Sequence, residues 1–269
     1  MTLRFRRISS EGSCVVSSSN ESIQKTVTVA LLLCLVCSVV VSASAVILRP
    51  AQAVNEQANM QMNILQAAGL YDPKQTVQEQ FELVSTRLVN LETGEFVEGM
   101  DTDGYDQRKA AKDPSMNRVL SGEEDIALIK RQAKVAKIYL IESGGNIEKI
   151  ILPIHGYGLW STLYGFMALE GDANTVAGLG FYEHAETPGL GGEVDNPNWK
   201  AQWAGKQVYD GDDVSLRLVK GGADRSDSYG VDGLSGATIT SRGVDNLVKF
   251  WMSDAGFKPF LDNVKQGRI

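Results

Sequence analysis

The longest uninterrupted apolar run of the chain covers residues 26–48, between Lys25 and Arg49. It contains no charged side chain, and at about 1.5 Å per residue it can span the roughly 30 Å hydrocarbon core of a bilayer. Basic groups gather before it, which predicts a cytoplasmic N-terminus and an exported remainder. The length of the run favours a retained transmembrane helix. A cleaved signal peptide is the alternative, because Ala43-Ser44-Ala45 fits a small-residue cleavage site.

Helical periodicity replaces the uniform run after Arg49. We expect an amphipathic helix over residues 50–70, ended by Gly69 and the turn that follows it. Its apolar side is formed by Met60, Ile64, Leu65 and Ala68. Residues 49–75 then form a stalk that holds the exported domain away from the membrane. Residues 1–25 are polar and rich in serine, and they are expected to form a disordered cytoplasmic tail.

Short runs of β-forming residues separated by turn residues dominate the exported domain, residues 76–269. The clearest pattern is a hairpin over residues 136–154, in which a turn at 143–146 joins two runs of β-forming residues. Further elements are a helix at 77–84, strands at 86–90, 163–169, 176–182 and 214–219, a turn at 92–95 and a surface excursion at 101–116. The predicted fold class is therefore α+β, a twisted antiparallel sheet with helices over at least one face.

A turn of small residues precedes the last helical pattern of the chain, whose apolar face is formed by Val244, Leu247, Val248 and Trp251. Thr238 falls at or just before the start of this helix, where free backbone N–H groups and the helix dipole favour a phosphate. Gly236 and Ala237 leave room for a large group to approach the backbone. An ordinary Ser/Thr helix cap fits the same residues, so the pattern alone leaves both interpretations open.

Two loops carry more glycine and aromatic residues than a plain sheet requires, at residues 153–160 and 183–193. Glycine lets a backbone approach a flat ligand, and Trp160 and Leu190 offer apolar surface for it. Tight connections between strands are the alternative. Neither loop has the context of a nucleotide-binding fingerprint, and the chain lacks the motifs of a hydrolase or zinc protease. We assign no catalytic residue.

The composition of the chain limits the kinds of partner and site that the protein can have. The net charge of the chain is −7, but residues 1–49 carry +3, which leaves −10 on the exported part. An acidic exported part argues against nucleic acid as a partner. The three cysteines, Cys14, Cys34 and Cys37, belong to the tail and the apolar run, where the last two are read as small apolar fillers rather than a redox pair. The exported domain therefore has no disulfide framework, and two histidines are too few for a histidine-rich metal centre. No metal site is predicted.

The small-residue turn resembles the flavinylation motif of periplasmic flavoprotein domains, D-x-x-[ST]-G-A-T. Asp232, Ser235, Gly236, Ala237 and Thr238 match it position by position. The resemblance implies that Thr238 carries FMN covalently through a phosphoester bond. A flavin transferase would attach the FMN once, from FAD, and Asp232 would serve that attachment step.

The wider chain is similar to the C-subunit family of bacterial sodium-translocating NADH:quinone reductases. The likeness rests on Pro153-Ile-x-Gly-x-Gly-Leu-Trp-Ser161, Tyr164-Gly-Phe166 and Glu186-Thr-Pro-Gly-Leu-Gly-Gly-Glu-Val194, and it covers the anchor and nearly all of the exported domain. The N-terminal tail is longer than this family leads us to expect. Flavin contacts are implied for Leu159, Trp160, Glu186, Thr187, Leu190 and Lys220. A solvated lysine is the alternative for the last of these, and His184 is expected to order its loop.

The function implied is that of an electron-transfer subunit in a six-subunit complex of the bacterial inner membrane. It would relay electrons from NADH, oxidised on another subunit, towards ubiquinone, with coupled Na⁺ export. Residues 26–48 hold no ionisable side chain, so a sodium pathway through this chain alone is not expected. Two alternatives remain. One is the G subunit of an Rnf ferredoxin:NAD⁺ complex, which shares Glu-Thr-Pro-Gly-Leu-Gly and Ser-Gly-Ala-Thr, and the other is a non-enzymatic periplasmic flavin-binding or sensory domain.

Overall fold

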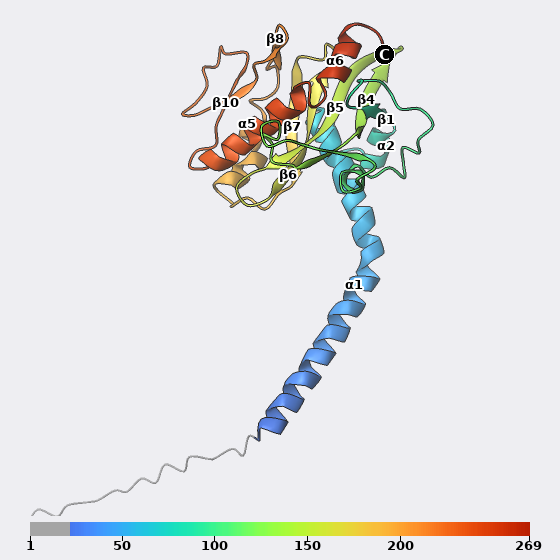
Figure 1. Ribbon diagram of the computed structural model, residues 1–269, viewed down its shortest axis with the longest axis vertical. Helices are drawn as coiled ribbons and strands as arrows, with labels where there is room; N and C mark the ends of the chain where they lie inside the picture. Colours follow the sequence, from blue (N-terminus) through green and yellow to red (C-terminus); the bar gives the residue numbers. More distant parts are fainter. Residues whose placement is uncertain (1–21) are drawn as a thin grey trace, which may run out of the picture. The chain divides into compact units, whose positions relative to one another are not determined.

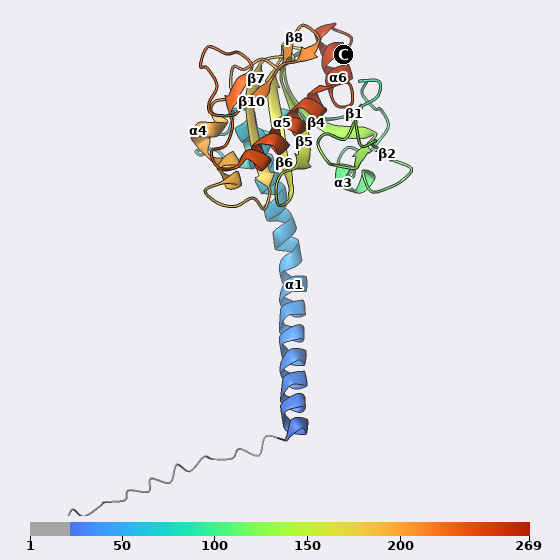
Figure 2. The same cartoon turned by 60° about the vertical axis from the view of Figure 1, so that its left-hand side comes forward.

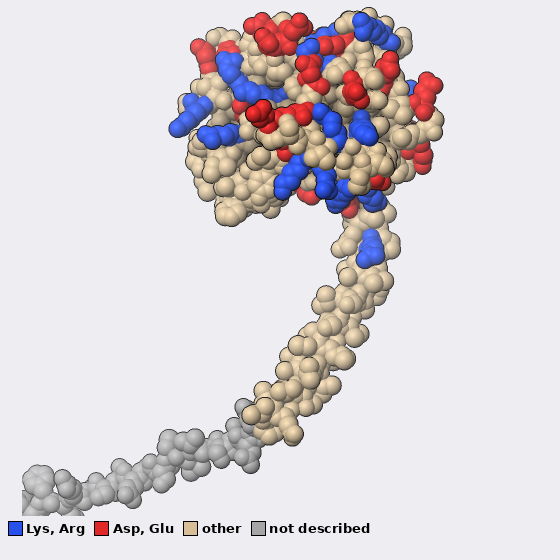
Figure 3. All heavy atoms as spheres, viewed as in Figure 1, with Lys and Arg blue, Asp and Glu red and all other residues tan. Residues whose placement is uncertain are grey.

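The computed structural model describes residues 22–269, and the predicted cytoplasmic tail lies almost wholly outside them (Figure 1). The chain divides into two compact units, with the boundary between Val54 and Asn55. Helix α1 (Ile23–Ala67) is long and apolar enough to cross a membrane, with a mean hydropathy of 2.8 in its most apolar window. Acidic and basic groups are interspersed over the face of the domain that Figure 3 shows, whereas α1 is almost free of them in this view.

Helix α1 joins two elements that the sequence pattern separated. The predicted span and the predicted stalk helix form one continuous helix, and Pro50 lies inside it. A proline removes one backbone hydrogen bond and disfavours the helix locally, but good helix-forming residues on both sides continue the helical pattern. The proline therefore does not end the helix.

The end of α1 is a core element of the domain rather than only a stalk. Gly69 has a φ of 69°, and the Leu70 N–H donates to the Leu65 carbonyl at 2.9 Å, which is the Schellman pattern of a helix end. Ile64 and Leu65 are buried in one apolar cluster with Phe166 of the sheet. The predicted stop at Gly69 is thus close to the observed one.

A five-stranded antiparallel sheet forms the centre of the domain, as predicted. Its order is β1-β4-β5-β6-β7, and each neighbouring pair is antiparallel. The strands are β1 (Val84–Asn90), β4 (Val135–Ser143), β5 (Asn146–Tyr157), β6 (Thr162–Glu170) and β7 (Val176–Glu183). The order follows from short turns between consecutive strands β4 to β7, which place each strand beside the one before it.

Helices cover both faces of this sheet. On β4, Ile138 and Leu140 belong to the cluster that contains the buried face of helix α5 (Thr238–Met252). Tyr139 and Ile141 of the same strand belong to the cluster that contains the end of α1. Successive side chains of a strand point to opposite faces, so this one strand contributes to both cores. The prediction of helices over at least one face is confirmed, and the second face is covered as well.

Helix α5 lies close against β5 because glycines remove side chains from the contact (Figure 2). A Cβ atom at Gly156 would lie 2.5 Å from Cβ of Leu247, and one at Gly243 would lie 2.5 Å from the Tyr157 carbonyl oxygen. The indole N–H of Trp251 also donates to the His155 carbonyl at 2.7 Å. These contacts hold the start of α5 beside the first glycine-rich loop.

Short elements complete the domain. They are α2 (Val77–Phe81), α3 (Gln107–Ala110), β2 (Asn117–Val119), β3 (Arg131–Ala133), the 3₁₀ helix η1 (Gly191–Asp195), α4 (Pro197–Lys200), β8 (Tyr209–Asp210), β9 (Asp213–Val214), β10 (Arg217–Val219), β11 (Gly230–Asp232) and α6 (Lys258–Lys265). The helix predicted at 77–84 ends early because Val84 begins β1. The segment 101–116, which was predicted to be a surface excursion, also contributes to the packed interior. It contains α3 and the buried Tyr105, whose hydroxyl donates to the Val135 carbonyl at 2.7 Å.

The single strand predicted at 214–219 is divided in two. The N–H groups of Ser215 and Leu216 both donate to the Val208 carbonyl, at 2.9 and 3.1 Å, and this interrupts the extended pairing. Strand β9 pairs with β8, whereas β10 pairs in parallel with β11. Strand β11 ends at Asp232 and so leads directly into the turn that precedes α5.

Candidate functional site

A cleft of about 610 Å³ surrounds Thr238 at the start of α5. Five residues that the sequence singled out line it together: Lys220, Asp232, Ser235, Gly236 and Thr238. Ala237 is buried beneath the turn and does not line the cleft. Ser241, Arg242 and Asp245 of α5 also line it. The sequence pattern did not reveal these three, because their side chains could be assigned to the cleft only once the helix was placed.

The turn before α5 is closed by Ser241 rather than by Thr238. The Ser241 hydroxyl accepts a hydrogen bond from the Leu234 N–H at 2.8 Å and donates to the Ala237 carbonyl at 3.0 Å. Ala237 occupies the N-cap position and supplies no side-chain cap. Within residues 22–269 the exposed hydroxyl of Thr238 has no hydrogen-bond partner. The ordinary-cap interpretation therefore fails for Thr238.

The backbone on both sides of Thr238 contains N–H groups that form no hydrogen bond. Among the described residues, the N–H groups of Ser235, Gly236 and the first three residues of α5 find no acceptor in the chain. Gly236 has a φ of 74°, and a Cβ there would approach Leu190 Cδ2 to 3.2 Å. A left-handed glycine beneath a leucine and a cluster of free N–H groups form a cradle suited to an anion with an apolar neighbour.

Asp232 is fixed from two sides. Its carbonyl accepts the indole N–H of Trp199 at 2.7 Å, and its N–H donates to the Gln202 side chain at 3.1 Å. Its carboxylate accepts the Ala223 N–H at 2.7 Å, which ties it to the loop that follows Lys220. Asp232 thus lines the cleft with a defined backbone and a carboxylate that already has one donor.

One buried carboxylate, that of Glu186, joins both glycine-rich loops to α5. Its Oε1 atom accepts the N–H groups of Leu159 at 3.0 Å and Trp160 at 2.9 Å. Its Oε2 atom accepts the Thr240 hydroxyl at 2.5 Å. The residue is only 5% exposed. The carboxylate therefore joins Leu159, Trp160 and Thr240, and the expected contact of Glu186 with a flavin stays a prediction.

The charge on Glu186 is stabilised by these same bonds. Burial on its own would raise the pKa of the Glu186 carboxyl, but hydrogen bonds from the Thr240 hydroxyl and from the N–H groups of Trp160 and Leu159 hold it below its ordinary value. Glycine makes the arrangement possible, since a Cβ at Gly158 or Gly191 would lie 2.7 Å from a carboxylate oxygen. The unusual glycine content of both loops thus has a local cause.

Apolar side chains reach solvent beside the start of α5. Trp160 is 65% exposed and Ile239 58% exposed, and Leu159 and Leu190 are also exposed. Sequence reasoning proposed three of these and missed Ile239, whose position after Thr238 was the available signal. Exposed large apolar residues in one region mark a binding surface. None of these four residues lines the cleft around Thr238, so their contact with a flat ring stays a prediction.

The second loop is folded by its own backbone and by His184. The Thr187 carbonyl accepts the N–H groups of Leu190 and Gly192, at 3.1 and 2.9 Å. His184 accepts the Glu186 N–H on Nδ1 at 3.2 Å, so its Nε2 carries the proton that is donated to Asp195 at 2.8 Å. Both ring nitrogens are occupied in ordering the loop.

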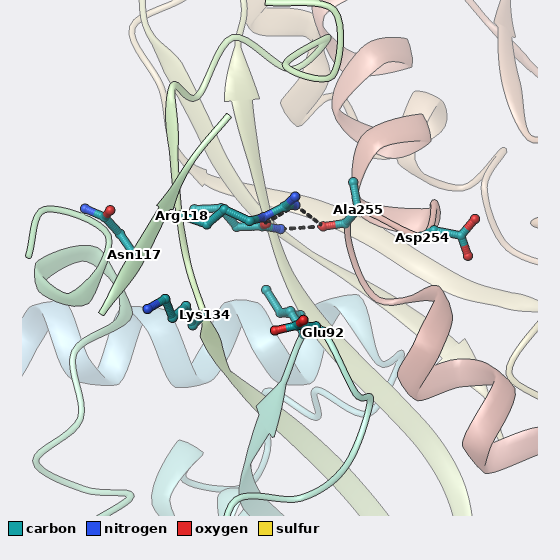
Figure 4. Close-up of a pocket in the computed structure, with 8 residues that line it drawn as sticks. Glu92, Asn117, Arg118, Lys134, Asp254 and Ala255 are labelled. Atoms are coloured by element: carbon teal, nitrogen blue, oxygen red, sulfur yellow. Dashed lines mark hydrogen bonds between the residues drawn. The ribbon is translucent and has the colours of Figure 1, made fainter. Parts of the chain in front are cut away.

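A smaller cleft of about 360 Å³ lies elsewhere, between the β2–β3 hairpin and the segment after α5 (Figure 4). Arg118 and Gln132 point across it and donate to the Ala255 carbonyl at 3.3 and 2.7 Å. None of the residues proposed from the sequence line it. Its polar groups bind the hairpin to the end of α5, which makes it a structural contact.

The chain is similar to known proteins over nearly its whole length. Residues 158–253 match the FMN-binding domain family. Over 258 residues the chain is 50% identical to the C subunit of the Na⁺-translocating NADH-quinone reductase of Pseudomonas aeruginosa, covering 93% of this chain and 99% of that protein. It is 47% identical to the corresponding protein of Vibrio anguillarum, covering 94% of this chain and 100% of that one.

Solved structures agree with this similarity. The crystal structure of NqrC from Shewanella oneidensis superposes with a TM-score of 0.73 at 36% identity, over 78% of this chain and 99% of that one. The C subunit from Parabacteroides distasonis gives a TM-score of 0.62 at 32% identity, over 80% and 96% of the two chains. The likeness therefore extends from sequence to fold.

Proposed function

Because the chain belongs to the C-subunit family of Na⁺-translocating NADH-quinone reductases, we propose that Thr238 carries FMN through a phosphoester bond. The chain then relays electrons from NADH towards ubiquinone inside the complex, and it needs no catalytic residue of its own. One observation carries the assignment. The hydroxyl of Thr238 is exposed in a cleft and has no hydrogen-bond partner among residues 22–269, while Ser241 supplies the bonds that close the turn.

The residues present fit both ends of FMN. Free N–H groups at the start of α5, with Lys220 in the same cleft, suit the phosphate. The exposed side chains of Leu159, Trp160 and Leu190 suit the ring system. Bound FMN supplies reversible electron transfer, and the protein binds it, orients it and limits its contact with water. Glu186 acts beneath them by holding these groups in place.

Attachment would consume the Thr238 hydroxyl once, during maturation by a flavin transferase. The threonine Oγ forms a bond to the flavin-side phosphorus of FAD, the phosphoanhydride bond breaks, and AMP leaves. The hydroxyl proton departs with help from a general base. We assign Asp232 to this step because its carboxylate lines the same cleft. A covalent tether also prevents loss of the flavin by dilution outside the cytoplasm.

Membrane placement follows from α1. The helix fits a membrane-anchored subunit, and we propose a single pass through the bacterial inner membrane with the N-terminus in the cytoplasm and the domain in the periplasm. Residues 26–48 hold no ionisable side chain. We therefore assign coupled Na⁺ export to the complex of six subunits and not to this chain alone.

The two alternatives receive less support. Identity of 47–50% over nearly full length to relatives named as the C subunit favours the quinone reductase over an Rnf-type G subunit. These relatives are named as subunits of a reductase, which also disfavours a free-standing sensory domain. Purification of the chain from its native membrane separates the alternatives, because only the proposed function requires the quinone reductase subunits to copurify with it.

The decisive test of the site is fluorescence in a denaturing gel. The full-length chain is coexpressed with a flavin transferase as wild type, as Thr238→Ala and as the control Thr102→Ala. We expect a fluorescent band for the wild type and the control and none for Thr238→Ala. A fluorescent Thr238→Ala band at wild-type intensity would overturn the attachment site.

A further inference from the structure

Arg242 of α5 has no place in the motif that marks Thr238, but it shares the cleft with that residue. We propose that its guanidinium binds the phosphodiester formed when FMN is attached to Thr238. Arg242 is then a cofactor-binding residue that sets how readily Thr238 is loaded. The inference rests on the proposed function and adds a residue to it.

Helix geometry brings Arg242 to the phosphate position. It follows Thr238 by four residues, so the two side chains share one face of α5. Side chains of a helix also lean towards its N-terminus, over the preceding turn. A long side chain at position 242 therefore extends towards the turn that contains Thr238.

Charge in the cleft is unbalanced in a way that calls for an anion. The Asp245 carboxylate accepts the Leu218 N–H at 2.8 Å and pairs with Lys249 at 2.7 Å, and the Asp232 carboxylate accepts a backbone N–H. Among the described residues, neither Lys220 nor Arg242 forms an ion pair or a hydrogen bond. Two unpaired cations near the positive end of a helix dipole are electrostatically unfavourable until an anion joins them.

The two cations differ in what they can hold. A guanidinium presents a planar fork of donors that matches two oxygens of a phosphate, whereas a lysine acts as a point charge on a flexible stem. Arg242 stands on a long helix. Lys220 precedes Gly221 and Gly222, both with positive φ, in an exposed loop. Arg242 therefore supplies the directed contact, and Lys220 supplies a second charge.

The test follows loading and the attached phosphorus separately. The full-length chain is incubated with FAD and a flavin transferase, and the initial rate of covalent labelling is measured in denaturing gels. Variants are Arg242→Ala and Arg242→Lys, with Arg225→Ala as the matched control because Arg225 is exposed and lies outside the cleft lining. The ³¹P resonance of each loaded, folded protein is then recorded, with Thr238→Ala as the check on the attachment site.

We expect Arg242→Ala to label about tenfold more slowly, as loss of a charged hydrogen bond predicts, and to shift the ³¹P resonance. Arg242→Lys should fall between it and the wild type, and Arg225→Ala should match the wild type in both measurements. Wild-type labelling by Arg242→Ala overturns the inference. Slow labelling of Arg242→Ala with an unshifted ³¹P resonance also overturns it, because Arg242 would then contact the transferase and not the attached phosphate. Labelling of Thr238→Ala would instead overturn the proposed function.

Discussion

Thr240 Oγ1 donates a hydrogen bond of 2.5 Å to Oε2 of Glu186, and both residues are buried. The bond connects the helix that starts at Thr238 to the loop that carries Leu190. The other carboxylate oxygen accepts the N–H groups of Leu159 and Trp160. A single carboxylate thus fixes the start of α5 relative to the exposed apolar side chains of the loops.

Replacement of this carboxylate should cost stability. Glu186→Ala leaves three donors without a partner, and we expect it to lower the free energy of unfolding by about 3 kcal/mol. Glu186→Gln keeps one acceptor oxygen and should cost about half as much. Urea unfolding of the full chain in detergent measures both. Equal midpoints for Glu186→Ala and the wild type would mean that the carboxylate does not hold the loops together.

The stability of the domain should depend on pH through His155. Burial, with a smaller contribution from Arg108, lowers the pKa of His155 from 6.5 to about 4, so the folded protein keeps this ring neutral. A histidine with a depressed pKa contributes stability that is fully present above pH 6.5 and is lost as the pH falls towards about 4. Urea midpoints measured from pH 7 to pH 4 should fall less for His155→Gln than for the wild type. Parallel curves for the two proteins would contradict this assignment.

The contact of Gly156 with Leu247 should be intolerant of a single methyl group. A Cβ at Gly156 would lie 2.5 Å from Cβ of Leu247, so Gly156→Ala must push α5 away from β5. We expect a loss of about 1–3 kcal/mol from overpacking and reduced FMN loading. Gly180→Ala is the matched control, because a Cβ there meets nothing within 4 Å. The prediction fails if the two variants unfold at the same urea concentration.

Trp160 should affect the flavin and not the fold. The side chain is 65% exposed, so Trp160→Ala should change the free energy of unfolding by less than about 0.5 kcal/mol. Loss of its apolar surface should make the attached flavin more accessible to iodide, which quenches flavin fluorescence. Val119→Ala is the control, since Val119 is 72% exposed on the β2–β3 hairpin. Equal iodide quenching in Trp160→Ala and the wild type would remove Trp160 from the flavin bed.

Local patterns predicted the sheet and the start of the last helix. The strands around Ile138 and Phe166 and the helix start at Thr238 were identified from periodicity and turn residues, because those signals lie within a few residues of the element they define. The division of the strand at 214–219 was not predictable in this way. It depends on the Val208 carbonyl, which reaches Ser215 and Leu216 from a neighbouring segment.

The site shows the same limit. Sequence similarity singled out Glu186 as a flavin contact, which stays a prediction. It could not reveal the bond of Glu186 to Thr240, which is more than fifty residues away in the chain. Arg242 was missed because no local pattern shows that its side chain lines the same cleft as Thr238. Residue types could be anticipated, whereas the direction of each side chain required the assembled fold.

The closing of the turn by Ser241 has a consequence for the order of maturation. Since the structural hydrogen bonds belong to Ser241, esterification of Thr238 breaks none of them. With Thr238 as the proposed attachment residue, the chain can complete its fold before a flavin transferase modifies it, and loading needs no local unfolding. Cofactor content and folded state are in this way separable properties, and a preparation can be fully folded while only partly loaded.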